Sequence, residues 1–496
     1  MPQTGREQPP IHRRHFFERV GSGFYGAALA YLMSRDGFGG SGLLASSATE
    51  SVEHEGRRIY DSRPRTPHFK PRARSVIHLF MNGGPSQMDL FDPKKELDKH
   101  HGEPYFDKIA GEVETPAQAG ALMRSPFKFQ QHGQSGMWVS ETLPHLAQHV
   151  DDIALIRSMH TTSLTHEPAL YKIQGGRLLP GYPSLGSWAA YGLGAENQNL
   201  PAYIVLDDPL RLPTNGVENW QSGFLPPVYQ GTRFRSKGSP VLNLKPEVEE
   251  PPEIIQLERD LLARLNRIHR RKRPGQPDLD ARISSYELAA RMQLEASDVL
   301  DLSQESPETL EMYGINEKRT ESYGRRCLIA RRLVESGVRF VQLYIDGQIW
   351  DHHEKIAQGL RSACGRTDKP IAGLLQDLKE RGLLDSTLVV WGGEFGRLPI
   401  AQLHAGKDEK KSGRDHNQNA MVTWMAGGGV KGGITYGSTD EIGLTAVENK
   451  VSVQDWHATI LHLLGLDHEK VFFKRHGLRE KLTSVFEARV IHDIIG

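Results

Sequence analysis

Three short polar clusters in the sequence could together hold a divalent metal ion. Carboxylate and imidazole groups are good ligands for Zn²⁺ and similar ions, and the clusters supply both. The first cluster directly follows a run of β-favouring residues at 339–345. Ligands in open α/β sheets bind beyond the carboxyl ends of the strands, so we expect the clusters to meet there in one composite site. The clusters are Asp351-His352-His353, Glu394 to Arg397, and Arg414-Asp415-His416.

Each of these residues also has an ordinary structural role open to it. Asp351 could cap a following turn or helix, and His352 could simply pack or form a hydrogen bond. Glu394 could form an ion pair with a neighbouring arginine. His457 lies inside a predicted helix and could be a core residue with no functional role. The residue types alone leave these alternatives open.

The elements that position the clusters follow a rhythm of strands and helices. The predicted helix 368–381 has apolar residues at i, i+3, i+4 and i+7, the spacing of one helix face. Strand–helix alternation is typical of a three-layer α/β/α sandwich with a mainly parallel sheet. The strands are predicted at 75–81, 153–156, 202–206, 339–345, 386–391 and 419–425, and further helices at 143–150, 168–174 and 453–464.

Residues 245–337 differ from the rest because they are rich in charge and in helix-forming residues, which predicts a helical insertion. The basic run 267–273 could suggest nucleic-acid binding, but basic side chains also suit the end of a solvated helix. We favour the helix end because carboxylates are abundant nearby. Lys+Arg and Asp+Glu both number 61 in the whole chain. That balance gives no argument for nucleic acid or a membrane surface as the partner.

The N-terminal residues are typical of an export signal. Arg13-Arg14 precedes a weakly apolar segment at 20–33, which is the twin-arginine pattern. The segment is too short and too interrupted to span a bilayer, and an amphipathic helix is the alternative. We therefore expect a signal segment at 1–36, a linker at 37–74, a folded domain at 75–496, and a periplasmic or secreted protein.

The chain has only two cysteines, Cys327 and Cys364, and neither lies in a CxxC or zinc-ribbon spacing. A thiolate metal site is therefore not expected. Cys327 falls on the apolar stripe of a predicted helix, so we interpret it as a core residue. A disulfide between the two cysteines is the less favoured alternative.

Motifs along nearly the whole chain, at residues 12–35 and 75–470, resemble a known family. The family is the secreted bacterial "domain of unknown function 1501", which looks like a branch of the alkaline phosphatase and sulfatase superfamily. The resemblance implies a large α/β/α sandwich with divalent metals at the strand ends. The motifs are HLFMNGGPSQMDLFDPK (78–94), THEPALYKIQGG (165–176), WDHH (350–353), GGEFGR (392–397), GRDHN (413–417), AGGGVKGG (426–433) and DWHATILHLLGLD (455–467).

The resemblance implies metal-binding roles for several positions. Asp351 and His353 match a late Asp/His pair of the superfamily, and His416 matches the region that supplies a late ligand or a sulfate-contacting cation. Glu394 stands where a sulfatase has the Asp of Asp-His-Gly, but Phe395, at the His position, cannot bind a metal.

The first strand and the nucleophile helix depart from the superfamily pattern. Asn82 replaces the acid that ends the first strand, although Asp89 is nearby. In the segment 166–177, which resembles the sulfatase nucleophile helix, His166 stands at the Cys position and Leu170 at the Arg position. There is no cysteine here to become formylglycine.

Hydrolysis of an anionic ester needs a Lewis acid, donors that neutralise developing charge, and a proton donor. Thr165 is the best candidate for a side-chain nucleophile, and His166 could be a ligand or a general acid. Arg397 and Arg414 are candidate anion contacts, because planar guanidinium groups suit phosphate and sulfate oxygens. The candidate metal ligands are Asp351, His353, Glu394, His416, Asn82 and Asp89.

These residues predict an exported, metal-dependent hydrolase of a sulfate or phosphate ester that uses Zn²⁺, Ca²⁺ or Mn²⁺. The expected substrate is an anionic ester or a sulfated polysaccharide. The alternative is a non-catalytic envelope module that binds anionic polysaccharide, and the missing cysteine, Asn82 and Phe395 favour it. A phosphomutase-like enzyme is a weaker third hypothesis, because its substrates are usually cytoplasmic.

Overall fold

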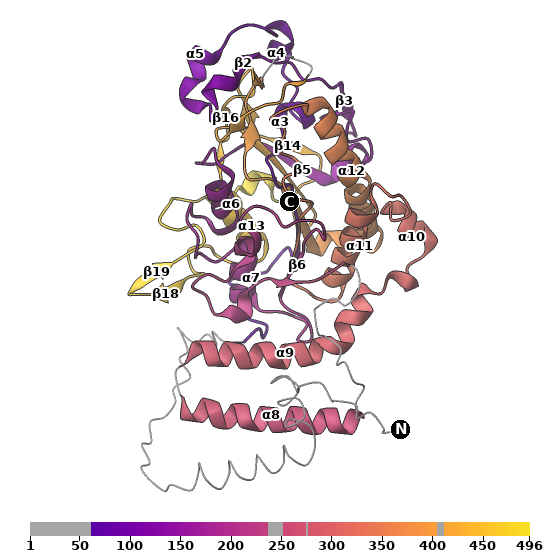
Figure 1. Ribbon diagram of the computed structural model, residues 1–496, viewed down its shortest axis with the longest axis vertical. Coiled ribbons are helices and arrows are strands. Elements are labelled where there is room, and N and C mark those ends of the chain that lie inside the picture. Colours follow the sequence, from indigo (N-terminus) through magenta and orange to yellow (C-terminus); the bar gives the residue numbers. More distant parts are fainter. Residues whose placement is uncertain (1–60, 237–250, 274–275, 404–410) are drawn as a thin grey trace, which may run out of the picture. The chain divides into compact units, whose positions relative to one another are not determined.

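The computed structural model describes residues 61–236, 251–273, 276–403 and 411–496 (Figure 1). The predicted signal segment 1–36 and most of the linker 37–74 lie outside these residues. Within the described part of the chain, no helix combines the length and apolar character needed to cross a membrane.

A nine-stranded sheet organises the structure. Every strand pair in it is parallel except the two pairs made by β13 (Met421–Ala426), which is antiparallel to both of its neighbours. The predicted α/β class with a mainly parallel sheet is therefore confirmed. The order is β14 (Ile434–Tyr436), β5 (Ile153–His160), β13, β9 (Thr387–Gly392), β1 (Ser75–Phe80), β8 (Phe340–Leu343), β6 (Tyr203–Leu206) and β7 (Thr232–Arg233), with β17 (Val451–Ser452) also paired to β5.

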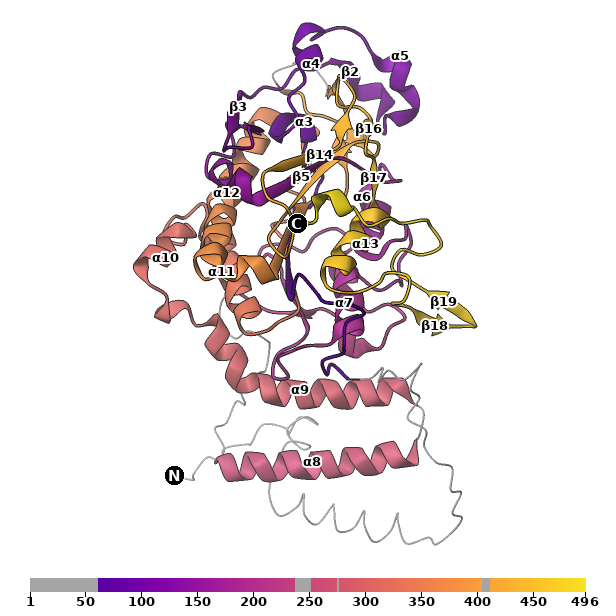
Figure 2. The ribbon, with the colours of Figure 1, turned by 180° about the vertical axis from the view of Figure 1, so that it is seen from behind.

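Helices cover both faces of the sheet (Figures 1 and 2). Successive side chains of a strand point to opposite faces, and β1 shows this. Val76 packs in a core cluster with residues of three helices, whereas Ile77 packs in a second cluster that contains residues of other helices. The first face is covered by α6 (His166–Gly175), α7 (Leu185–Leu193) and α13 (Val453–Leu463), and the second by α11 (Glu321–Glu335) and α12 (Ile356–Glu380).

Two predicted helices differ from the structure, and one side chain links them. Helix α12 begins 12 residues before the predicted start at 368 and continues through Pro370. The predicted helix at 143–150 is instead a 3-10 turn, η3 (Leu146–Asp152). Asp368 of α12 accepts hydrogen bonds from the backbone N–H groups of His145 (2.9 Å) and Leu146 (2.8 Å). This long-range capping fixes the start of the turn, and local sequence does not show it.

The charged region 245–337 is helical where it is described. It contains α8 (Pro252–Lys272), α9 (Pro277–Leu300), α10 (Pro307–Met312) and then α11. The basic side chains Arg270, Arg271 and Lys272 lie exposed in the last turn of α8. Helix α11 belongs to the core layer, and its Cys327 is buried there. Cys327 and Cys364 are both free, so the disulfide alternative is wrong.

Two small antiparallel pairs bring loops to the carboxyl end of the sheet. They are β10 (Gly396–Arg397) with β12 (His416–Asn417), and β2 (Ala119–Leu122) with β11 (Ile400–Gln402). The remaining elements are α3 (Gln87–Leu90), α4 (Lys95–Lys99), α5 (Phe106–Ile109), β3 (Phe129–His132), β4 (Met137–Ser140), β15 (Ser438–Thr439), β16 (Ala446–Glu448), β18 (Phe473–Arg475), β19 (Leu478–Glu480), and the short turns η1 (Ala110–Glu112), η2 (Pro116–Gln118), η4 (Gly216–Trp220), η5 (Pro227–Tyr229), η6 (Leu302–Gln304), η7 (Leu384–Ser386) and η9 (His492–Ile494).

Candidate metal centre

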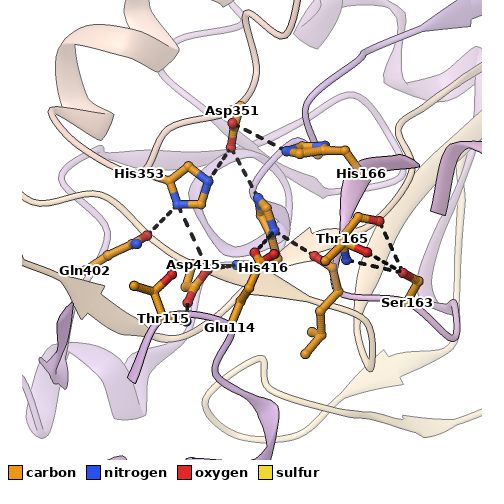
Figure 3. A network of polar contacts seen from close by, with 12 residues as sticks. Glu114, Thr115, Ser163, Thr165, His166, Asp351, His353, Gln402, Asp415 and His416 are labelled. Atoms are coloured by element: carbon orange, nitrogen blue, oxygen red, sulfur yellow. Dashed lines mark hydrogen bonds and ion pairs between the residues drawn. The ribbon is translucent and has the colours of Figure 1, made fainter. Parts of the chain in front are cut away.

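Four side chains from separate parts of the chain converge on one point (Figure 3). Asp351 and His353 follow β8, His416 begins β12, and His166 is the first residue of α6. One ligand atom from each lies within 4.8 Å of the ligand atoms of the others. The structure therefore brings together three of the predicted ligands and adds His166, which was predicted as catalytic.

The three imidazoles turn their Nε2 atoms toward the Asp351 carboxylate. Oδ1 lies 2.9 Å from His353 Nε2 and 3.3 Å from His416 Nε2. Oδ2 lies 3.4 Å from His166 Nε2. Imidazole nitrogens and carboxylate oxygens at such separations can all reach a single ion with bonds of roughly 2 Å. The group is a His/Asp cluster that could bind a metal.

Two of the imidazoles are held at their other ring nitrogen by side chains. His353 Nδ1 donates to Gln402 Oε1 (2.5 Å), and His166 Nδ1 donates to Glu394 Oε1 (2.7 Å). A proton fixed on Nδ1 leaves the Nε2 lone pair available, and metal-binding histidines are usually oriented in this way.

The third imidazole, His416, is held by a backbone carbonyl and a carboxylate. Its Nδ1 lies 2.7 Å from the Leu164 carbonyl oxygen and 2.5 Å from Glu114 Oε2. The hydrogen bond from His416 lowers the pKa of Glu114 below its ordinary value, and burial opposes this effect. All three rings thus have an acceptor behind them.

A tight turn after β1 closes against Asp351. Gly83 has φ of +114°, and a Cβ atom added there would lie 2.5 Å from the Asp351 backbone nitrogen. Its N–H donates to Glu394 Oε1 at 2.9 Å. Only glycine fits this close approach, because a side chain would displace the loop.

Charge–charge contacts set the protonation of the centre. Burial disfavours ionised Asp351, but Arg397 and hydrogen bonds from the three imidazoles hold the pKa of its carboxyl far below the usual range. Burial also disfavours a charged His166, yet Asp351 and Glu394 raise its pKa to about 9. In the metal-free protein His166 therefore carries a proton at neutral pH.

Arg397 is fully buried, and its guanidinium group is engaged by the protein itself. Nη2 lies 2.6 Å from Asp351 Oδ1, and the group also donates to four backbone carbonyls. The predicted contact between Arg397 and a substrate anion does not fit this placement. The carbonyls belong to Gly83, Gly84, Trp350 and Arg414.

Arg414 and Asp89 form a second ion pair, and both of its side chains are fully buried. Arg414 Nε lies 2.7 Å from Asp89 Oδ2, and Nη2 lies 3.2 Å from Oδ1. Ser86 Oγ also donates to Asp89 Oδ2 at 2.5 Å. Asp89 lies outside the four-residue cluster and Arg414 is closed to solvent. The two side chains form a structural ion pair here, and their roles as metal ligand and anion contact stay predictions.

The remaining predicted residues surround the cluster without joining it. Glu394 supports His166, and its Oε2 is buried with no hydrogen-bond partner in the described chain. Asn82 Oδ1 accepts from the Ile345 N–H (3.4 Å), so Asn82 holds the strand end. Thr165 is exposed, and its hydroxyl is 3.3 Å from Ser163 Oγ (Figure 3).

Two other histidines, His352 and His457, pack or form hydrogen bonds in the core, as the structural alternatives proposed. His352 is buried against α12, and burial lowers its pKa to about 4. His457 is fully buried and Nε2 bonds the Ile173 carbonyl at 2.8 Å. Phe395, which cannot bind a metal, packs 4.3 Å from the His416 ring and 4.8 Å from the His166 ring.

Sequence reasoning missed the residues that support the imidazoles from behind. Gln402 ends β11, whereas Glu114 and the Leu164 carbonyl lie in loops, and all three are far in sequence from the ligands they hold. No motif marks them, and a backbone carbonyl carries no sequence signal. The register of β11 with β2 decides that Gln402 reaches His353.

A family model described as "Protein of unknown function (DUF1501)" matches residues 73–495. The chain belongs to this family. The predicted resemblance to DUF1501 is thereby confirmed over these residues. Among curated proteins, none matches the chain.

Several solved structures share part of the DUF1501 protein's arrangement. The lipoteichoic acid synthase LtaP from Listeria monocytogenes is 10% identical, with a TM-score of 0.36, and the match covers 82% of this chain and 76% of that chain. The phosphonate monoester hydrolase SpPMH from Silicibacter pomeroyi is 10% identical, with a TM-score of 0.36 and coverage of 85% and 76%. Alkaline phosphatase from the Antarctic bacterium TAB5 is 13% identical, with a TM-score of 0.32 and coverage of 75% and 94%. Likeness at this level carries no conclusion about activity or substrate.

Proposed function

We propose that this DUF1501 protein is a metal-dependent hydrolase of phosphate or sulfate esters. The supporting observation is that three Nε2 atoms face Asp351 while each ring's Nδ1 has an acceptor. His166 Nε2 is buried, and its contact within the described residues is the 3.4 Å ion pair with Asp351 Oδ2. A buried ring nitrogen of this kind suits an ion, so the residues fit a metal.

The donor set also favours some metals over others. His166, Asp351, His353 and His416 would hold the ion. Three imidazoles suit Zn²⁺ and the carboxylate also suits Mn²⁺, whereas Ca²⁺ prefers a shell of oxygen ligands. Of the three ions that the sequence predicted, we therefore propose Zn²⁺ or Mn²⁺. When bound, such an ion supplies a Lewis acid and lowers the pKa of water.

The protein's own residues would orient the centre and accept a proton. Phe395 is buried against two of the imidazoles and excludes water from that side. Glu114 is 31% exposed and its pKa is lowered, so it is an ionised carboxylate at the solvent side of His416. Because that carboxylate lies at Nδ1, on the far side of the ring from Asp351, we assign to Glu114 the orientation of His416 and the acceptance of its Nδ1 proton.

Water rather than a side chain is the nucleophile in this proposal, and substitution tests it. Thr165→Ala should change kcat/KM by less than about threefold, because its hydroxyl pairs with Ser163. His166→Ala should lower kcat/KM by about 100-fold or more, because it removes a ligand. Activity is measured on 4-nitrophenyl phosphate and 4-nitrophenyl sulfate with Zn²⁺ or Mn²⁺ present.

The outcomes separate the hypotheses. A loss in Thr165→Ala as large as in His166→Ala would make Thr165 the nucleophile and refute attack by water. Binding of a sulfated polymer by a folded, metal-loaded protein that hydrolyses neither ester would support the alternative, a non-catalytic polysaccharide-binding module. A sulfated sugar substrate is a further proposal, which the same ester panel addresses. Export by the twin-arginine route is another, which a secretion assay addresses.

Metal binding should become tighter as the pH rises. An ion at His166 Nε2 must displace a proton from a group whose pKa is raised from 6.5 to about 9. That proton stabilises the metal-free fold below about pH 6.5, and the contribution is lost as the pH rises through about 9. Affinity should therefore rise about tenfold per pH unit between roughly pH 6.5 and 9.

Calorimetry in two buffers of different ionisation enthalpy measures this effect directly. At pH 8 the wild-type protein should release about one proton per ion bound. His166→Gln, which has no titrating ring, should release fewer protons and bind more weakly. An affinity that stays constant from pH 6.5 to 9 would contradict the assignment of His166 as a ligand.

A further inference from the structure

Helix α8 carries an apolar stripe that remains exposed. Ile254, Leu257, Leu261, Leu265 and Ile268 recur at intervals of three or four residues, which places them on one helix face. Their exposed fractions range from 39% to 65%. Isolated exposed leucines are common on protein surfaces, but a continuous stripe along one helix is typical of a binding surface.

The contact of α8 with its neighbour does not use this stripe. The partly buried positions of α8 are Ile255, Ala263 and Asn266, and they lie roughly 120–160° around the helix from the centre of the stripe. Arg259 Nη2 donates to the Ala290 carbonyl of α9 at 3.4 Å. The apolar face therefore points away from the hydrogen bond that joins α8 to α9.

The rest of α8 is strongly basic, in contrast to the neutral whole chain. Residues 252–273 contain seven Arg or Lys residues and three Asp or Glu residues, which gives a formal net charge of +4. Several of the basic residues occupy the face opposite the stripe or the last turn. The basic residues are Arg259, Arg264, Arg267, Arg270, Arg271, Lys272 and Arg273.

We propose that α8 docks on an anionic phospholipid surface and lies in the plane of the interface. Helices with an apolar leucine and isoleucine face and an arginine-rich polar face bind such surfaces, because the apolar side chains enter the acyl boundary and the cations meet phosphate groups. A second copy of the chain fits less well, since two helices that each carry a net charge of +4 would repel each other. The net charge of the whole chain is zero, so the total charge does not show the positive charge of α8.

Vesicle sedimentation with the full chain tests the proposal. Wild-type protein should bind phosphatidylcholine vesicles that contain about 30% phosphatidylglycerol at least about tenfold more tightly than pure phosphatidylcholine vesicles, and 0.5 M NaCl should weaken this binding. Leu257→Glu/Leu265→Glu should lower binding by about tenfold or more. The matched control is Leu210→Glu/Leu478→Glu, which adds the same charge at leucines that are 76% and 64% exposed elsewhere.

Each outcome bears on the proposal. Loss of binding in the α8 variant, with retention in the control and equal melting temperatures, supports it. Equal binding by both variants would assign any membrane affinity to another segment, such as the apolar residues 20–33, and overturn it. Failure of the wild type to bind also overturns it, as does a dimer that becomes monomeric in Leu257→Glu/Leu265→Glu without vesicles.

Discussion

Asp351→Asn is expected to lower kcat/KM for ester hydrolysis by about 1000-fold or more. Among the described residues, Asp351 is the one carboxylate that faces all three imidazole Nε2 atoms. An amide keeps the shape of the side chain but removes the charge that would bind a cation. The loss should appear in kcat/KM on 4-nitrophenyl phosphate or sulfate, and added metal should not restore it.

Asp346→Asn is the matched control for this substitution. Asp346 lies five positions earlier beyond the same strand, and its side chain is 23% exposed compared with 20% for Asp351. Its carboxylate pairs with Arg366 (3.4 Å) and Arg211 (3.7 Å) rather than with the imidazoles. It should keep activity within about twofold. Asp351→Asn with more than about a tenth of wild-type activity would refute the assigned role.

The largest effect on stability is expected for Arg397→Met. This substitution removes the only guanidinium beside Asp351 in the described chain and leaves four buried carbonyls without a donor. Breaking a buried pair on one side typically costs about 3–5 kcal/mol. The free energy of unfolding in urea should fall by about that amount, provided that no metal is present to compensate Asp351.

Arg397→Lys and Arg211→Met make this test specific. A lysine ammonium cannot reproduce the planar fork that reaches several acceptors, so Arg397→Lys should recover only part of the loss. Arg211 pairs with Asp346 at the surface, where its side chain is 69% exposed, and Arg211→Met should cost less than about 0.5 kcal/mol. A loss below about 1 kcal/mol in Arg397→Met would show that Arg397 does not hold the centre together.

The sheet could be predicted from sequence because its strands are short apolar runs that end in polar clusters. Strands β1 and β9 lie where the alternation of apolar runs and turns placed them. Asp368 looks like the first residue of a helix in sequence, but its side chain caps a turn more than 200 positions away, and α12 begins 12 residues earlier. Local patterns determine where an element lies more reliably than where it begins.

The candidate centre was predictable in outline, because parallel strands deliver their carboxyl ends to one edge of a sheet. This rule correctly placed Asp351 and His353 at that edge, and His416 reaches it because β13 is antiparallel and begins beside the end of β9. It could not decide whether His166 or Glu394 is the further ligand. The two residues are 228 positions apart and are joined by a hydrogen bond. A carboxylate after a strand looks like a ligand in sequence, but the His166 ring lies between Glu394 and Asp351.

The roles of the two arginines were also beyond the sequence. Arginine beside a candidate site suggests an anion contact, but burial decides what it binds. Arg397 and Arg414 are both fully buried and turn toward Asp351 and Asp89. The backbone carbonyls that complete their hydrogen bonds depend on the path of the chain and not on residue type.

The measurement that tests the central claim most directly is the metal content of the purified, folded full chain, determined by elemental analysis after dialysis with Zn²⁺ or Mn²⁺. Binding at Asp351, His353, His416 and His166 predicts about one tightly held ion per chain in the wild type and in Asp346→Asn, and close to none in Asp351→Asn or His416→Ala. A folded wild-type protein that holds no ion, or an Asp351→Asn variant that holds as much as the wild type, would contradict it.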